Sequence, residues 1–265
     1  GDGDDRLEGN FGNDSLFGGN GNDTLTDDQG SNVLDGGAGN DNLTSRSLSG
    51  DHTLLGGAGN DSLNATGQKV SLDGGDQDDN LSVTGQLQQG GSTSFVMDGQ
   101  ATLLGGMGND NLNVNSYGSS SLDGGDGNDY LYATGSWNSY TTFGTKPADT
   151  TLVGGAGDDT LYADMLASAS LDGGDGVDTV SVNNVAAATL MGGAGTDTLN
   201  VNAGNEGFTF NTNNGSTGRA NKSYALDGGD DDDTISVTGS FNKGYGQATV
   251  SALGGAGNDT ITVSD

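Results

Sequence analysis

A nine-residue phrase recurs along the chain in a fixed register. Residues 18–26 read GGNGNDTLT, and residues 36–44 read GGAGNDNLT, eighteen residues later. With the first glycine as position one, position six is Asp in all thirteen copies, the first of which is truncated. Position eight is aliphatic in every copy. The aspartates are Asp5, Asp14, Asp23, Asp41, Asp61, Asp79, Asp110, Asp129, Asp159, Asp178, Asp197, Asp233 and Asp259. A phrase repeated at this period predicts stacked coils.

The residue types within the phrase indicate a cation-binding turn followed by a short strand. Glycines permit positive φ and let backbone carbonyls turn inward. Carbonyl and carboxylate oxygens are hard ligands that suit Ca²⁺ better than a transition metal. After the turn, stretches such as TVSVN (179–183) and TISVT (234–238) alternate polar and apolar residues. Such alternation is typical of a half-buried strand.

The pattern GG-x-G-x-D-x-aliphatic-x resembles the RTX (repeats-in-toxin, hemolysin-type) calcium-binding nonapeptide family over nearly the whole chain. The resemblance implies an all-β, right-handed parallel β-roll or β-solenoid with calcium-binding turns, here with irregular loop insertions. It also implies a secreted bacterial protein in which each ion lies between loops of successive coils. Its ligands would be backbone carbonyls and the position-six Asp, so the thirteen aspartates above are the candidate metal ligands. We expect residues 1–265 to form one elongated unit, a fragment of a larger secreted protein.

Composition agrees with folding that depends on several calcium ions. The chain has 52 Gly, 30% apolar residues and a net charge of −30. A chain of low hydrophobicity and high charge does not collapse unaided. Glu8 and Glu206 are the only glutamates among 37 acidic residues, so the carboxylates stay close to the backbone. Ten ions, each at about ten times its dissociation constant, would add about 14 kcal/mol, the whole stability of an ordinary domain.

The spacing of the loops leaves their placement open between two geometries. Loops eighteen residues apart stack on one flank, which puts the Gly9 loop on the other flank. Its stacking partner, residues 27–35, reads DDQGSNVLD and has Asn32 where the Asp is expected. This favours ions mainly along one flank, with the other flank free to diverge. Later loops alternate between two types, with LDGG or with LLGG-like sequences, which leaves open that the types occupy opposite flanks of a wider coil.

Three copies depart from the glycine pattern. Gln77 and Asp231 replace the glycine at position four, and Asn10 replaces the glycine at position two. Asn tolerates positive φ, whereas Gln77 places its site in doubt. Asp231 lies in a run of four aspartates that needs a cation or solvent nearby.

Nothing in the sequence indicates catalysis, so we expect no enzymatic activity. The single histidine, His52, is interpreted as a surface loop residue. HExxH and G-x-S-x-G motifs are absent. Acid pairs such as Asp73/Asp76 recur at every second loop, which favours repeat geometry over acid–base work. The acidic field excludes nucleic acid, and no apolar run is long enough to span a membrane.

Four insertions, 84–100, 134–149, 202–224 and 238–247, interrupt the regular spacing. They gather aromatic residues among Ser, Thr, Asn and Gly, with basic residues in or beside them. The aromatic residues are Phe95, Trp137, Tyr140, Phe143, Phe208, Phe210, Phe241 and Tyr245, and the basic residues are Lys146, Arg219, Lys222 and Lys243. The aromatic residues either cap the solenoid core or form a contact surface for other subunits or glycans.

We therefore carry three functional hypotheses for this calcium-binding chain, all of them extracellular. In the first, it is a structural segment of a surface layer, filament or adhesin that calcium makes rigid, with homo-oligomeric or lattice contacts through the insertions. In the second, it is the calcium-binding module of a secreted enzyme or toxin. In the third, it binds carbohydrate and resembles the roll modules of alginate-modifying enzymes, and Trp137 is its candidate contact.

Overall fold

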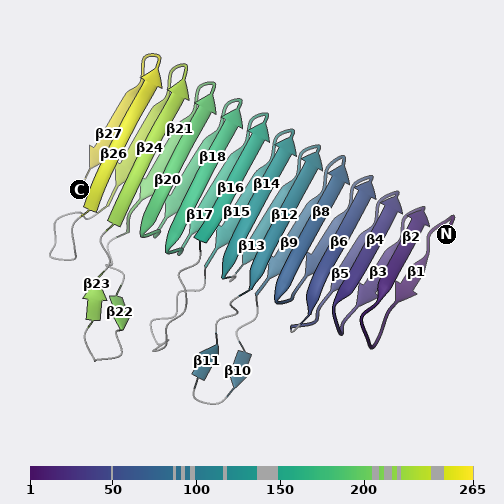
Figure 1. Ribbon diagram of the computed structural model, residues 1–265. Helices are drawn as coiled ribbons and strands as arrows, with labels where there is room; N and C mark the ends of the chain where they lie inside the picture. Colours follow the sequence, from purple (N-terminus) through teal and green to yellow (C-terminus); the bar gives the residue numbers. More distant parts are fainter. Residues whose placement is uncertain are drawn as a thin grey trace.

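The computed structural model contains two long parallel β-sheets, which extend along its whole length (Figure 1). It describes residues 1–48, 50–85, 88–90, 93–95, 99–115, 118–135, 149–204, 209–211, 217–219, 222–239 and 248–264. Each coil contributes one strand to each sheet, and successive coils pair in parallel register. A parallel β-solenoid was the expected fold, and this arrangement confirms it.

The sheets are named by the numbering of their strands. The even sheet contains β2 (Ser15–Asn20), β4 (Asn32–Ala38), β6 (Asp51–Ala58), β8 (Lys69–Asp76), β12 (Gln100–Met107), β14 (Ser119–Asp126), β16 (Asp149–Ala156), β18 (Ser168–Asp175), β20 (Ala187–Ala194), β24 (Lys222–Asp230) and β26 (Ala248–Ala256). The odd sheet contains β1 (Arg6–Glu8), β3 (Thr24–Asp27), β5 (Asn42–Ser45), β7 (Ser62–Ala65), β9 (Asn80–Thr84), β13 (Asn111–Asn115), β15 (Tyr130–Thr134), β17 (Thr160–Asp164), β19 (Thr179–Asn183), β21 (Thr198–Asn202), β25 (Thr234–Thr238) and β27 (Thr260–Ser264).

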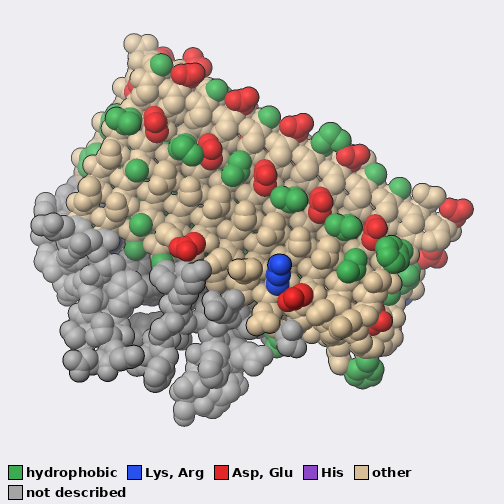
Figure 2. Space-filling model, viewed as in Figure 1, with side chains coloured by type: hydrophobic (Ala, Val, Ile, Leu, Met, Phe, Trp, Pro, Cys, Tyr) green, Lys and Arg blue, Asp and Glu red, His purple; other side chains and the backbone are tan. Residues whose placement is uncertain are grey.

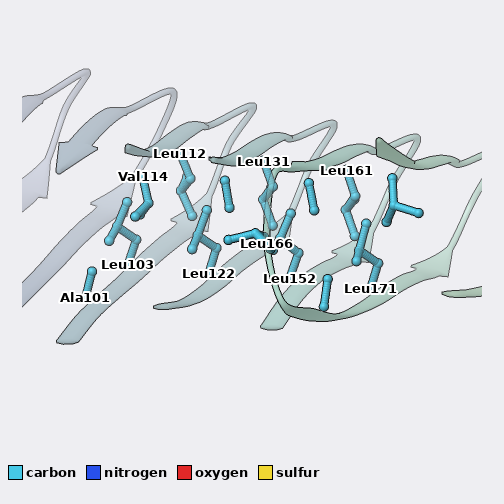
Figure 3. Packing of buried hydrophobic residues seen from close by; sticks show 14 of the residues in the cluster. Ala101, Leu103, Leu112, Val114, Leu122, Leu131, Leu152, Leu161, Leu166 and Leu171 are labelled. Carbon is cyan, nitrogen blue, oxygen red and sulfur yellow. The ribbon is translucent and has the colours of Figure 1, made fainter. Parts of the chain in front are cut away.

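The core is a narrow double column of aliphatic side chains between the sheets. Leu103, Leu122 and Leu152 of the even sheet stack on one another and face Leu112 and Leu131 of the odd sheet (Figure 3). These leucines are fully buried. Because the side chains alternate in and out along each strand, one register-locked aliphatic residue per strand is enough to build the column. The aliphatic residues at position eight supply the odd-sheet half of it, except Leu16, which lies in β2 of the even sheet.

Two kinds of connection join the sheets and define the two flanks of the solenoid. The GG-x-G-x-D loops lead from the even sheet into the odd sheet, and we call this side the loop flank. The connections back to the even sheet begin and end on the return flank, whose described residues are 9–14, 28–31, 46–48, 50, 66–68, 85, 88–90, 93–95, 99, 118, 135, 165–167, 184–186, 203–204, 209–211, 217–219 and 239. Each of the four insertions spans the segment between an odd-sheet strand and the even-sheet strand that follows it. Two of them contain antiparallel hairpins, β10 (Gln88–Gly90) with β11 (Thr93–Phe95) and β22 (Thr209–Asn211) with β23 (Thr217–Arg219).

The two loop types share the loop flank and alternate from coil to coil. Asp73 in β8 pairs with Leu55 on one side and Leu104 on the other, and Asp123 follows Leu104. The interpretation that places the types on opposite flanks is therefore wrong. The full column on the outer face of the even sheet is Phe17, Asp35, Leu55, Asp73, Leu104, Asp123, Val153, Asp172, Met191, Asp227 and Leu253.

Electrostatics explains this alternation. Neighbouring strands lie about 4.8 Å apart, so an Asp on every coil would hold like charges within a Debye length. Placing an apolar residue on every second coil doubles the separation to about 10 Å. Acidic and hydrophobic side chains alternate visibly along this face in Figure 2.

The substitution Leu104→Asp tests this explanation. It would place a carboxylate between Asp73 and Asp123, which we expect to destabilise the folded chain by about 1 kcal/mol at low salt. Thr102→Asp is the matched control, because Thr102 lies on the same exposed face of β12 between Ser71 and Ser121. Thermal unfolding in calcium should show a larger loss for Leu104→Asp, and added salt should reduce the difference. Equal losses at every salt concentration would contradict the explanation.

Candidate metal centre

The aspartates of the loop flank form one continuous hydrogen-bonded ladder. In each coil the backbone amide of the position-six Asp donates to Oδ1 of the equivalent Asp in the next coil. The bond from Asp61 to Asp79 measures 2.7 Å, and so does the bond from Asp79 to Asp110. The ladder runs through Asp5, Asp23, Asp41, Asp61, Asp79, Asp110, Asp129, Asp159, Asp178, Asp197, Asp233 and Asp259. The fold thus brings twelve of the thirteen predicted ligands into one row.

The second carboxylate oxygen of these aspartates is buried without a partner. Between Asp23 and Asp233 each ladder aspartate is at most 3% exposed. The Oδ2 atoms of these ten residues have no hydrogen-bond partner. A buried ionised carboxylate with an unsatisfied oxygen is unfavourable. Such a row is therefore incomplete as a purely protein structure.

Glycines keep open the space around each unpartnered oxygen. A Cβ added at Gly74 would collide with Oδ2 of Asp79 and lie 2.6 Å from the carbonyl oxygen of Gly105 in the next coil. Gly75 has a φ of +109°, and a Cβ there would strike the carbonyl oxygen of Gly57. Only glycine fits both positions. The result is a cradle bordered by a carboxylate oxygen and a backbone carbonyl of the following coil.

This donor set fits a hard divalent cation. Carboxylate and carbonyl oxygens are the ligands that Ca²⁺ takes, in flexible geometry. Within the described part of the chain no three His, Cys, Asp or Glu side chains cluster as a metal site. A cation in these cradles would therefore draw most of its ligands from the backbone.

Burial of the ladder perturbs its ionisation. The pKa of Asp79 and of Asp159 is raised to about 7, chiefly by burial and also by the charges of neighbouring aspartates, while the backbone amide bonds act in the opposite direction. Burial likewise raises the pKa of Asp61, Asp110 and Asp197 to about 6. Without a cation, the folded row therefore favours protonated carboxyl groups.

The loops that lack a glycine keep the regular shape. Gln77 and Asp231 adopt positive φ values of 77° and 75°, and Asn10 has a φ of 70°. Asp79 and Asp233 both remain in the ladder. Asp231 and Asp232 are exposed. Water can therefore solvate these two carboxylates of the four-aspartate run. The departures cost local strain and leave the site geometry unchanged.

On the return flank, a pair of acids replaces the single row. Asp14 is the thirteenth predicted ligand, and it lies beside Asp27, which is 1% exposed. Each has an Oδ2 atom that is buried without a partner. A Cβ at Gly9 would collide with Asp27 Oδ2 and lie 3.2 Å from Asp14 Cβ. Burial raises the pKa of Asp27, and the charge of Asp14 adds to this.

Sequence reasoning missed Asp27 as a site residue. It occupies position one of the degenerate loop, where a glycine is expected, so the pattern counted it as a loss. The available signal was its register, because the stretch from Asp27 to Asp35 keeps the nine-residue rhythm and follows the loop of Asp14 by eighteen residues, the spacing at which loops stack.

A buried polar network follows this pair and ends the return-flank row. Asn32 takes the ladder position and accepts the Asp14 amide at 3.1 Å through Oδ1. Its amide nitrogen donates to Ser45 Oγ at 3.4 Å, and Ser45 Oγ meets His52 Nδ1 at 2.9 Å. His52 Nε2 bonds the Ser47 carbonyl oxygen at 3.0 Å. The next residue in this column is Val70, so the flank passes from ionic to polar to apolar.

The interpretation of His52 as a surface loop residue is therefore wrong. His52 lies in β6 and is 2% exposed. The sequence around it, SGDHTLL, looks like a polar loop, but alternation along β6 turns this side chain inward.

The predicted contact residues of the insertions fall mostly outside the described part of the chain. This holds for Trp137, Tyr140, Phe143, Phe208, Phe241, Tyr245, Lys146 and Lys243. Lys222 is described and is buried, and its ammonium donates to the carbonyl oxygens of Ala203 and Gly204. Tyr224, nearby, is 1% exposed and donates its hydroxyl to the Val185 carbonyl oxygen at 2.7 Å. These two residues close the core and do not form a contact surface.

Comparison with known proteins gave one family. A family model described as RTX calcium-binding nonapeptide repeat (4 copies) matches residues 1–26, 17–47, 49–85, 104–136, 147–165, 187–207 and 252–265, more than half of the chain. Searches of curated proteins and of solved structures gave no match. No helix in the described structure is long and apolar enough to cross a membrane.

Removing one ladder charge should weaken cation-dependent folding. Asp110→Asn can keep the ladder bond, as Asn32 does, but loses the charge of the buried Oδ2. We expect a higher calcium midpoint of folding in circular dichroism and one ion fewer in calorimetry, a loss of about 1.4 kcal/mol at ten times the dissociation constant. Asp123→Asn, on the outer face of the even sheet, is the control. Identical titrations of both variants would refute the assignment.

Protons should partly substitute for the cation. A raised pKa in the folded state means that the folded chain binds more protons than the unfolded chain, so stability falls as pH rises. This contribution is fully present below 3.8 and is lost as pH rises through about 6 and about 7, the values for Asp61 and Asp79. In cation-free buffer, the β signal in circular dichroism should therefore grow between pH 7.5 and about pH 5. A β signal that decreases on acidification would contradict this predicted pH dependence.

Restoring a glycine should relieve strain. Gln77→Gly removes a side chain from a left-handed position, and we expect it to stabilise the calcium-bound chain by about 1 kcal/mol. The control is Gln68→Gly, on the return flank, because Gln68 has no positive φ. Thermal unfolding in calcium measures both, and a lower melting temperature for Gln77→Gly would show that the side chain contributes a contact.

Proposed function

Because this chain belongs to the family of RTX calcium-binding nonapeptide repeat proteins, we propose that it is an extracellular structural segment that several calcium ions fold and make rigid. The observation that carries the proposal is the row of buried, unpartnered Oδ2 atoms from Asp23 to Asp233. It extends through nearly every coil, so ion binding and folding concern the whole length of the chain. When bound, calcium supplies the divalent positive charge that this row lacks.

The separation of the two flanks supports a structural role. The loop flank is regular and holds the ladder, whereas every insertion follows an odd-sheet strand in the sequence, before the chain re-enters the even sheet. Change in the insertions therefore leaves the ion-binding row intact. A rod of this kind presents variable segments along one side, as a surface-layer, filament or adhesin segment requires. We propose that contacts between copies run through the insertions and that the chain itself catalyses no reaction.

Secretion fits the same proposal. Extracellular calcium modules have dissociation constants of about 0.1–1 mM, so a chain that needs many ions would remain unfolded where calcium is scarce. Folding would then begin where calcium is abundant, outside the cell.

Light scattering after size exclusion tests the proposal in chelator, in about 10 mM calcium and in equal magnesium. We expect an expanded monomer in chelator and in magnesium, because Mg²⁺ demands a tighter octahedral geometry. In calcium we expect a compact core and a larger, filamentous species. A compact monomer in calcium would limit the chain to a folding module, and an unchanged hydrodynamic radius would refute calcium-dependent folding.

The insertions supply a matched variant. Residues 135–148 can be replaced by the short connection that the chain uses at residues 165–167. We expect this variant to fold with calcium as before and to assemble less. Full assembly without that insertion would place the contacts elsewhere.

A further inference from the structure

The outer face of the odd sheet carries a short aromatic stack that ends abruptly. Tyr132 in β15 and Tyr162 in β17 occupy paired positions, with ring centroids 5.4 Å apart and planes 1° from parallel. The next residue in the same column is Ser181 in β19, followed by Asn200 in β21 and Ser236 in β25. After Tyr162, the side chains in this column therefore change from large aromatic rings to small polar groups.

A shallow depression of about 330 Å³ lies at this step. It is lined by Tyr162 and by residues of the three following strands, which are Ser181, Val182, Asn183, Asn200, Val201, Asn202, Ser236 and Thr238. Val182 and Val201 belong to the buried core. One wall is the tyrosine, and the remaining walls carry hydroxyl and carboxamide groups. The depression is open to solvent and is only as large as a small ligand needs.

Hydrogen bonds fix the orientation of its carboxamides. Asn183 donates to Asp164 Oδ1 at 3.0 Å, and Asn200 donates to Ser181 Oγ at 3.5 Å. Asn202 accepts the Gly204 amide at 3.1 Å through Oδ1, so its amide nitrogen can donate elsewhere. A carboxamide offers a donor and an acceptor side by side. Vicinal hydroxyl groups offer the same pair in return.

The chemistry of the walls selects the ligand. The face of a tyrosine ring is negative and attracts weakly positive C–H groups, such as those on one face of a pyranose ring. No lysine or arginine lines the depression among the described residues, and Asp164 lies beside it. An anionic ligand such as a uronate, a phosphate or a nucleic acid is therefore disfavoured.

We propose that this step on the odd sheet binds a neutral glycan, with a pyranose ring stacked on Tyr162 and its hydroxyl groups held by Asn183, Asn200 and Asn202. The sugar ring would continue the stack that Tyr132 and Tyr162 begin. The site lies on the rigid sheet and not on an insertion, and it differs from a uronate-binding site in charge. It adds a binding activity to the structural role proposed above.

The test uses the whole chain in calcium, after circular dichroism has shown each variant to be folded. Maltohexaose, cellohexaose and hexa-N-acetylchitohexaose are titrated by calorimetry, with oligoguluronate as the anionic comparison. We expect at least one neutral hexasaccharide to bind, and the anionic probe to bind more weakly. Failure of all three neutral probes up to about 10 mM, where binding would be worth under about 3 kcal/mol, would overturn the proposal.

Two variants locate the site. Tyr162→Ser removes the platform, and Ser181→Tyr fills the depression while extending the stack, so both should weaken binding about tenfold or more. Tyr130→Ser is the matched control, because Tyr130 is exposed in the same strand as Tyr132 but does not line the depression. Retained binding in both site variants would overturn the assignment.

Two further outcomes would assign the ligand or the site differently. If Trp137→Ala abolishes glycan binding while Tyr162→Ser leaves it intact, the site lies on the insertion. If phenol binds as tightly as the hexasaccharide and is equally sensitive to Ser181→Tyr, the depression holds an aromatic side chain of a partner.

Discussion

Burial of a carboxylate in every coil of the loop flank is the constraint on which the rest of this structure depends. Stacking the coils in parallel register places the aspartates one above another, with Oδ1 bonded to the previous coil and Oδ2 left without a partner. Burial disfavours the ionised carboxylates, so a bound cation or, at lower pH, protons would stabilise the row. Glycine at position one is one consequence, because a Cβ there would close the space beside Oδ2, and glycine at position two is another, because it has a positive φ and a Cβ there would strike a backbone carbonyl of the previous coil.

The same stacking rule governs features far from the ions. On the outer face of the even sheet, acids appear only on alternate coils, which keeps like charges about two strand spacings apart. On the return flank, the acid pair Asp14 and Asp27 gives way to the buried network of Asn32, Ser45 and His52, and then to Val70. Once a column has become apolar, its connection need not bind anything, and insertions can enter there.

The part of the solenoid that sets the coil geometry is therefore distinct from the parts that we propose for recognition. The loop flank sets the coil geometry through ions and glycines, and it changes little from coil to coil. The return flank and the outer face of the odd sheet carry the irregular features, including the tyrosine step at Tyr162. A side chain on the sheet is held by the same register that holds the core, so the stacking of the coils positions any binding site built there.

The sequence by itself determined the period, the position-six aspartates, the aliphatic column and the calcium chemistry, because these repeat locally within nine residues. It did not decide which flank each loop occupies, because an insertion adds residues without adding a coil. It also missed the burial of His52 and Lys222, the pairing of Asp27 with Asp14, and the stacking of Tyr132 on Tyr162. The residues involved lie up to thirty positions apart in the sequence, as Tyr132 and Tyr162 do. Only the register of neighbouring coils brings them into contact.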